Sequence, residues 1–216
     1  MTCFIFDLDG TLVDTIPLHI ESGLYALRKY GLNFVDPKDV RDEIGKSFHD
    51  IVLDICRKYN IPISEELIKD IWQIKHLYFL KNIHKVKLLP GVLELLEFLR
   101  NNHSKIALAS SSPKDSVKAI LDHFNLWGYF DVVLTADDVS KAKPDPEIFL
   151  RAKEKLGCND CIVIEDSLYG VIAGKKAGCK VYAVLTGVGK RKDLEKYADK
   201  VFRDLTELLS WVSKQL

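Results

Sequence analysis

The sequence predicts an α/β fold, with a doubly wound, mostly parallel sheet and an inserted, all-helical second domain. Short apolar runs recur along the chain, and longer amphipathic stretches separate them. This alternation is typical of βαβ units, whose parallel strands are covered by helices on both faces. Residues 16–84 interrupt it with helical periodicity and no convincing strand. We therefore assign 1–15 and 85–216 to the α/β core and 16–84 to the helical insertion.

The apolar run Cys3-Phe4-Ile5-Phe6 predicts the first strand. Four later runs predict the other strands, at residues 106–109, 131–135, 161–165 and 180–184. Three stretches between them repeat apolar residues at helical spacing, which predicts helices within 91–102, 116–124 and 146–157.

Helix boundaries in the core carry recognisable signals. Asp145-Pro146-Glu147 predicts a helix start with aspartate as the cap, and Ser112-Pro113 predicts another with serine as the cap. Gly157 predicts a helix end. In the insertion, helical periodicity extends over residues 18–31, 47–60 and 64–83.

Composition limits the classes of partner. Thirty-one lysines and arginines balance 31 aspartates and glutamates, so the net charge gives no support for nucleic-acid binding. No apolar run approaches the roughly 20 residues that a membrane span needs, and the N-terminal strand does not resemble a signal peptide. We therefore expect a cytoplasmic protein, either a monomer or a weak dimer.

The five cysteines are odd in number and scattered, which indicates reduced thiols. Cys158 and Cys161 form a lone C-x-x-C, and a structural zinc site usually needs two more ligands. We interpret the two cysteines as ordinary small hydrophobic residues, and a zinc or redox role is the alternative.

Polar side chains follow the predicted strands where each one ends. Asp7 and Asp9 follow the first, Ser110-Ser111-Ser112 the second, Lys141 and Lys143 the third, and Glu165-Asp166 the fourth. Ligands of open parallel sheets bind beyond the carboxyl ends of the strands, so we expect these groups to gather there. Crowded carboxylates repel each other unless a cation lies among them. Oxygen ligands suit Mg²⁺ better than zinc.

The D-x-D spacing indicates the chemistry. Residues i and i+2 of an extended segment face the same way, so Asp7 and Asp9 would address one substrate atom. One carboxylate can attack a phosphoryl group while the other moves a proton. Mg²⁺, Lys143 and Ser110 would stabilise charge on the phosphoryl oxygens. Taken singly, each of these residues is more often a cap, a turn former or a solvated charge.

Two other motifs do not match the sequence. A calcium loop beginning at Asp7 would need glycine and glutamate where the chain has Leu12 and Leu18. A P-loop ending at Gly45-Lys46-Ser47 would need its first glycine at Val40.

Four segments carry a family resemblance. DLDGTLVDT, ASSS, KAKPDPEIF and IEDSLYGVIAGKKAG resemble, in order, the four motifs of the haloacid dehalogenase-like hydrolases. The chain is most similar to the branch of β-phosphoglucomutases and sugar-phosphate phosphatases, which has a Rossmann-like core and a helical cap. The resemblance covers essentially the whole chain, although the cap matches only weakly.

The resemblance implies Asp7 as nucleophile and Asp9 as general acid/base. It implies phosphate binding by Thr11, Ser110, Ser111 and Lys143, and Mg²⁺ binding by Asp7, Glu165, Asp166 and the carbonyl group of Asp9. True dehalogenases of this superfamily lack the second aspartate and need no metal, so Asp9 indicates a phosphotransferase.

The branch contains both phosphatases and mutases. Mutases carry a cap arginine after a Gly-x-Ser stretch, and this chain has Phe48 there. The loop SSSPK also resembles that of the phosphatases. His19 and Lys75 nevertheless fit positions that mutases use, so a β-phosphoglucomutase-type mutase stays as the alternative. The candidate cap and substrate residues are Thr15, His19, Lys46, Phe48, Lys75, Ser112 and Lys114.

We therefore expect a Mg²⁺-dependent phosphatase acting on a small phosphorylated metabolite, such as a sugar phosphate. A receiver domain, phosphorylated on aspartate as a signal, shares the sheet, the acidic cluster and the lysine. The inserted helices and the D-x-D spacing argue against it. A silent binding protein is the other alternative, and the intact motif set argues against that.

Overall fold

The computed structural model describes residues 3–41 and 48–215 of the chain. The chain divides into two compact units. The first, here called the core domain, comprises residues 1–14 and 87–216, and the second, the helical domain, comprises residues 15–86.

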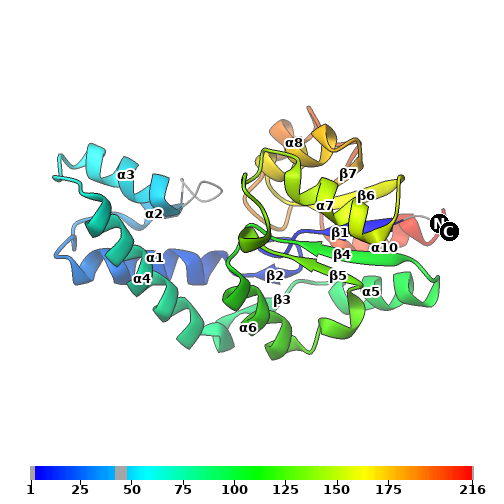
Figure 1. The fold of residues 1–216 in the computed structure, drawn as a ribbon, viewed down its shortest axis with the longest axis horizontal. Helices are drawn as coiled ribbons and strands as arrows, with labels where there is room; N and C mark the ends of the chain where they lie inside the picture. Colours follow the sequence, from blue (N-terminus) through cyan, green and yellow to red (C-terminus); the bar gives the residue numbers. More distant parts are fainter. Residues whose placement is uncertain (1–2, 42–47, 216) are drawn as a thin grey trace. The chain divides into compact units, whose positions relative to one another are not determined.

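The core domain contains a six-stranded parallel sheet, which confirms the predicted α/β fold (Figure 1). The strand order is β5-β4-β1-β6-β7-β8, so the N-terminal strand lies at the centre. The bounds are β1 Cys3–Phe6, β4 Lys105–Ala109, β5 Val132–Leu134, β6 Cys161–Glu165, β7 Lys180–Val184 and β8 Lys200–Phe202. Phe6 is in register with Leu108 on one side and with Ile164 on the other. This register brings the carboxyl ends of β1, β4 and β6 to one edge.

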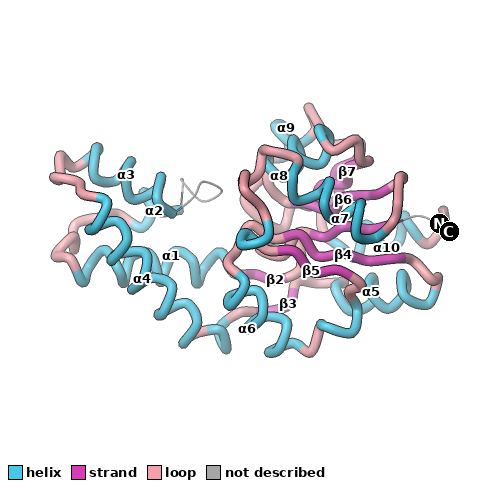
Figure 2. Tube along the Cα trace, in the orientation of Figure 1, coloured by secondary structure: helices cyan, strands magenta, loops and turns pink. Residues whose placement is uncertain are grey.

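Helices cover both faces of this sheet (Figure 2). Helices α7 and α8 pack on one face, while α5 and α10 pack together on the other. The core helices are α5 Val92–Asn101, α6 Lys114–Phe124, α7 Glu147–Leu156, α8 Leu168–Lys176, α9 Arg191–Leu194 and α10 Leu205–Val212. Ile5 lies with Phe149 in the apolar cluster beneath α7 and α8. Phe4 and Phe6 are also buried and, by strand alternation, face the other side. Burial on both faces explains why β1 reads as a continuous apolar run.

Every strand predicted for the core is present. The structure also contains three short strands that the apolar pattern of the sequence does not predict. The edge strand β8 has only three residues. β2 Val13–Asp14 and β3 Lys87–Leu88 form an antiparallel pair at the point where the chain leaves and re-enters the core domain.

The helix caps differ from prediction in two places. The N-cap residue of α6 is Pro113, and the backbone N–H of Lys114 donates to Asp137 at 2.6 Å. The prediction that Ser112 caps this helix is therefore wrong. The N-cap of α7 is Pro146, with the Asp145 carboxylate accepting from the N–H of Glu147. Gly157 ends α7 with φ of 63°, as predicted.

The described part of the helical domain contains helices and no strand. Its elements are α1 Ile16–Lys29, α2 Pro37–Arg41, α3 Phe48–Lys58, α4 Glu65–Lys81 and the short 3₁₀ helix Ile83–Lys85. They enclose their own apolar cluster, which includes Leu27, Ile55 and Ile71. Among the helices of 3–41 and 48–215, none combines the length and apolarity needed to cross a membrane.

The cysteines do not all follow the prediction of reduced thiols. Cys3 and Cys158 are joined as a disulfide, whereas Cys56, Cys161 and Cys179 are free and buried. The prediction is wrong for the first two because β1 starts beside the end of α7, a proximity that spacing along the chain cannot reveal. The C-x-x-C residues are not paired with each other.

Two aspartates fix the edge strands of the sheet. Asp199, before β8, donates its N–H to the carbonyl of Val181 at 2.8 Å, and its carboxylate accepts the N–H of Val181 at 2.7 Å. Asp131, before β5, makes the same pair of contacts with Ile106. Each carboxylate also binds a cation; for Asp199 this is Lys175, at 2.8 Å.

We predict that Asp199→Ala lowers the free energy of unfolding by about 1–3 kcal/mol, because the buried N–H of Val181 loses its acceptor. Lys175→Ala should cost no more than about 1 kcal/mol, because it removes only an exposed ion pair. Burial acts to raise the pKa of Asp199, but Lys175 and the Val181 N–H outweigh it and lower the pKa from its usual value of 3.8. The contribution of the ionised Asp199 carboxylate to the free energy of unfolding should therefore be complete above about pH 4, and it should disappear as the pH falls through the folded-state pKa of Asp199.

Urea denaturation of both variants between pH 7 and the acid limit of stability measures these differences. Equal losses of unfolding free energy in the two variants at pH 7 would show that the ion pair with Lys175, and not the contact with the Val181 backbone, stabilises the fold.

Candidate functional site

Three buried carboxylates meet at the carboxyl edge of the sheet. Asp7 follows β1, and Glu165 ends the neighbouring strand β6 and precedes Asp166. One carboxylate oxygen from each lies within 4.8 Å of the others. The N–H of Asp7 donates to the carbonyl of Ile164 at 3.0 Å, which continues the ladder into the site. The pairing of β1 with β6 therefore brings these three residues together.

Lys143 lies inside this cluster. Its ammonium group donates to Asp7 Oδ1 at 2.7 Å, to Glu165 Oε1 at 2.8 Å and to the carbonyl of Ala109 at 2.9 Å. The side chain is 6% exposed, and its Nζ lies 4.9 Å from the centre of the buried Phe149 ring. Burial alone would lower the pKa of Lys143, but Asp7 and Glu165 raise it above its usual value. The two carboxylates thus favour the charged form of Lys143 despite its burial.

One lysine does not neutralise the cluster. Burial raises the pKa of Asp7 well above its usual value; Lys143 opposes this, and the charges of Glu165, Asp166 and Asp9 add to it. Burial and Glu165 raise the pKa of Asp166 to about 8, against the opposing effects of the Val188 N–H and Lys143. The raised pKa values mean that these carboxylates do not readily ionise together without a further positive charge beside them.

The donor set fits a hard divalent cation. Asp7, Glu165 and Asp166 offer only oxygen, and Mg²⁺ is typically held by one or two carboxylates while it keeps several waters. A bound cation would favour the ionised forms of all three residues. Within the described ranges, no other group of histidine, cysteine, aspartate and glutamate offers three converging ligand atoms.

Asp9 is held by a serine from the loop that follows the neighbouring strand β4. The hydroxyl group of Ser112 donates to Asp9 Oδ2 at 2.7 Å. The backbone N–H of Ser112 donates to the hydroxyl of Ser110, which is fully buried at the end of β4. Ser112, predicted as a substrate-side residue, thus contacts the predicted general acid/base directly.

Glu165 organises its surroundings as well as contributing charge. Its Oε2 accepts from the backbone N–H groups of Asp166 and Ser167 and from the Ser167 hydroxyl, at 2.9–3.0 Å. Gly170 allows this arrangement, because a Cβ there would lie 1.7 Å from Glu165 Oε1. Thr11, predicted to bind phosphate, is fully buried with its hydroxyl 3.5 Å from Asp166 Oδ1.

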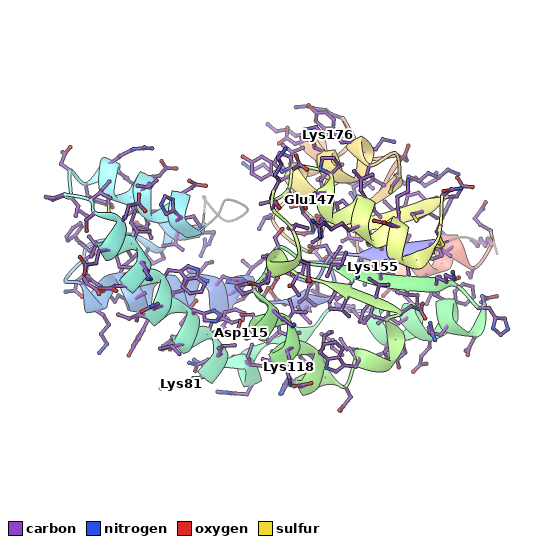
Figure 3. All side chains as sticks on the ribbon, viewed as in Figure 1. Lys81, Asp115, Lys118, Glu147, Lys155 and Lys176 are labelled. Atoms are coloured by element: carbon purple, nitrogen blue, oxygen red, sulfur yellow. A yellow bond between two sulfur atoms is a disulfide. The ribbon has the colours of Figure 1, made fainter. Side chains whose placement is uncertain are left out.

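The loop that carries Lys143 is fixed from two helices. Glu147, labelled at the start of α7 in Figure 3, accepts the N–H groups of Ser140 and Lys141 at 2.9–3.1 Å. Lys176 of α8, labelled in the same figure, donates to the carbonyl of Pro144 at 3.3 Å. These contacts hold the backbone on both sides of Lys143.

A pocket of about 190 Å³ lies beside two predicted phosphate ligands, Ser111 and Lys143. Its other lining residues come from the segment after β5 and from α7: Ala136, Val139, Ser140, Lys141, Ala142 and Ile148. Ser111 is exposed at this position, whereas Ser110 is not.

The residues predicted from the cap pattern lie in both units. In the helical domain, Lys75 Nζ lies 3.2 Å from His19 Nδ1, and the His19 ring stacks on Phe79 at 4.6 Å. Thr15 is buried and precedes α1. Lys114 is in the core domain at the start of α6. Lys46 and the side chain of Phe48 lie outside the described residues.

Sequence reasoning missed the segment Thr186–Gly189, which follows β7 and contacts the site. The N–H of Val188 donates to Asp166 Oδ2 at 2.9 Å, and the hydroxyl of Thr186 donates to the carbonyl of Gly10 at 2.6 Å. Two glycines directly after a predicted strand mark a close approach of the backbone, and this signal could have identified the segment.

Comparisons with known proteins agree with this geometry. Residues 4–184 match the family described as haloacid dehalogenase-like hydrolase. The chain is 33% identical over 206 residues to a phosphorylated carbohydrates phosphatase of Thermotoga maritima, covering 90% of each sequence. It is 34% identical to a bifunctional riboflavin kinase/FMN phosphatase of Arabidopsis thaliana, of which it spans only 54%.

Among solved structures, a β-phosphoglucomutase of Clostridium difficile has a TM-score of 0.83 and 29% identity, with 99% of this chain and 96% of that chain covered. The similarity to the Thermotoga maritima and Clostridium difficile proteins is thus nearly end to end. The chain therefore belongs to the haloacid dehalogenase-like hydrolases.

Proposed function

We propose that this enzyme is a Mg²⁺-dependent phosphatase that hydrolyses a small phosphorylated metabolite through an aspartyl-phosphate intermediate. The observation that carries the proposal is the contact of Lys143 with Asp7 inside a cluster of carboxylates. A carboxylate beside an ammonium group can approach a phosphate dianion, because the lysine offsets the repulsion between them.

The first half of the reaction forms the intermediate. Asp7 attacks phosphorus while the bond from phosphorus to the leaving oxygen breaks, and Asp9 donates a proton to that oxygen. Lys143 and the Ser110 hydroxyl stabilise charge on the phosphoryl oxygens. Asp7, Asp166, the Asp9 carbonyl and Glu165 would hold Mg²⁺, which when bound would supply further electrostatic stabilisation of that charge.

The second half releases phosphate. Asp9, now ionised, takes a proton from water as the water oxygen attacks phosphorus, and the bond to Asp7 breaks. The hydrogen bond from Ser112 holds the Asp9 side chain in one place for both steps. Atoms balance as one ester and one water giving one alcohol and one phosphate.

A sugar phosphate or similar small ester is the substrate class that we favour, since the chain resembles a phosphatase of phosphorylated carbohydrates. The alternative is a mutase. His19 and Lys75 favour it, since they lie 3.2 Å apart and could present positive charge to a second phosphate. The phenylalanine at position 48 argues against it, because it cannot make charge-assisted hydrogen bonds to phosphate.

We predict that Asp7→Asn abolishes turnover and preserves the fold. Asparagine keeps the shape of the side chain but is not a nucleophile, so the rate should fall by several orders of magnitude. Phosphate release from a panel of phosphorylated sugars, glycolate phosphate, nucleotides and pyrophosphate measures the loss. Wild-type enzyme in excess chelator is the metal control. A variant that retains more than about a tenth of the wild-type rate would remove Asp7 from this role.

A second prediction concerns Asp9. Asp9→Asn should slow the hydrolysis of alkyl phosphates more than that of p-nitrophenyl phosphate, because a poor leaving group needs a proton and nitrophenolate does not. The ratio of kcat values on the two substrates is the measurement. Equal losses on both would contradict proton donation by Asp9.

We also predict that free phosphate, and not an isomerised sugar phosphate, is the main product from glucose 1-phosphate. ³¹P NMR, in the presence of a trace of glucose 1,6-bisphosphate, follows both products. Formation of glucose 6-phosphate faster than phosphate release would establish the mutase alternative.

A further inference from the structure

We infer that the segment Thr186–Gly189 sets the Mg²⁺ affinity of the site and that Thr186 is a positioning residue for the metal ligands. The inference rests on the proposed Mg²⁺ site at Asp7, Glu165 and Asp166. Thr186 touches neither the carboxylates nor a reacting atom in the structure, so it acts through Gly10 and through its own segment.

The segment holds Asp166 at two points. Val188 donates its N–H to the side-chain oxygen Oδ2 at 2.9 Å, and Gly189 donates its N–H to the Asp166 carbonyl at 3.0 Å. The other side-chain oxygen, Oδ1, lies 3.5 Å from the hydroxyl of Thr11. Backbone and side chain of Asp166 are thus fixed together, which sets where its oxygens point.

Thr186 connects this segment to the D-x-D turn. Its hydroxyl donates to the carbonyl of Gly10 at 2.6 Å, while the N–H of Gly10 donates to the carbonyl of Val13 at 2.8 Å. The peptide groups on both sides of the Gly10 Cα are therefore held. The first of them contains the Asp9 carbonyl, the proposed backbone ligand of Mg²⁺.

Steric contacts show how closely the segment approaches. A Cβ at Gly187 would lie 1.7 Å from Asp166 Oδ2. A Cβ at Gly10 would lie 2.6 Å from the same oxygen and 3.0 Å from the Cα of Gly187. Only residues without a side chain fit on both sides of this carboxylate, so the carboxylate cannot swing away from the cluster in either direction.

Groups that hold metal ligands in place typically change metal affinity by about 10- to 100-fold when removed. Thr186 binds the Gly10–Thr11 peptide, which directly follows the Asp9–Gly10 peptide, and it belongs to the segment that holds Asp166. Its hydroxyl therefore joins the turn that carries one proposed ligand to the segment that positions another. A hydroxyl with a purely structural role would change stability and leave Mg²⁺ affinity unchanged.

The test is Mg²⁺ binding to the full chain without substrate, measured by titration calorimetry. Thr186→Val should raise the Mg²⁺ Kd about tenfold, and Thr186→Ser, which keeps the hydroxyl, should restore it to within about twofold. Thr135→Val is the matched control: the Thr135 hydroxyl also donates a hydrogen bond, to Asp138 at 2.8 Å, but Thr135 lies after β5. It should lower the urea midpoint and leave the Mg²⁺ Kd unchanged.

Gly187→Ala is a second variant, in case Thr186→Val does not fold. Its Cβ should displace Asp166 and weaken Mg²⁺ binding at least tenfold, while Gly128→Ala, where nothing lies within 4 Å, should change nothing. An unchanged Kd in the folded Thr186→Val or Gly187→Ala protein overturns the inference alone. Wild-type protein that binds no Mg²⁺, or that turns over fully in excess chelator, overturns the proposed metal site itself.

Discussion

One buried ammonium group shared by two carboxylates is the interaction on which the site depends. Lys143 contacts Asp7 and Glu165 at less than 3 Å, with Asp166 beside them and almost no solvent at any of the four. The contacts neutralise part of the cluster, and the carboxylate oxygens that converge there form a donor set that fits a hard cation. Neighbouring residues hold this arrangement in place. Glu147 and Lys176 accept and donate hydrogen bonds that fix the loop carrying Lys143. Ser167 donates to Glu165, and Gly170 leaves room for the Glu165 side chain.

The position of the cluster follows from the sheet. Parallel strands with central β1 deliver their carboxyl ends to one edge, so residues 136 and 158 positions apart in the sequence become neighbours. This is why the core strands and the main site residues could be predicted from the sequence. The central strands are buried apolar runs, and Asp7, Ser110 and Glu165 are the first polar side chains that follow or end them.

Other features could not be predicted, for identifiable reasons. Strand β8 is short and pairs on one side only, so little apolar pattern marks it. Ser112 looked like a helix cap because a serine before proline satisfies the local rule, yet a carboxylate from another strand binds it instead. The Cys3–Cys158 pair and the contact of Thr186 with Gly10 join segments more than 150 residues apart, and local patterns carry no signal for them.

The two-residue ribbon of β2 and β3 has an evolutionary consequence. Asp14 and Lys87 are partners in this antiparallel pair, so the whole helical domain is inserted between two neighbouring backbone positions of the core domain. Antiparallel partners lie only about 5 Å apart, a gap that a tight turn can close. The helical domain can therefore be lengthened, replaced or removed by recombination at a single junction without changing the strand order of the sheet. A lineage can thus acquire a new inserted domain while it inherits the same carboxylate cluster at the edge of the sheet.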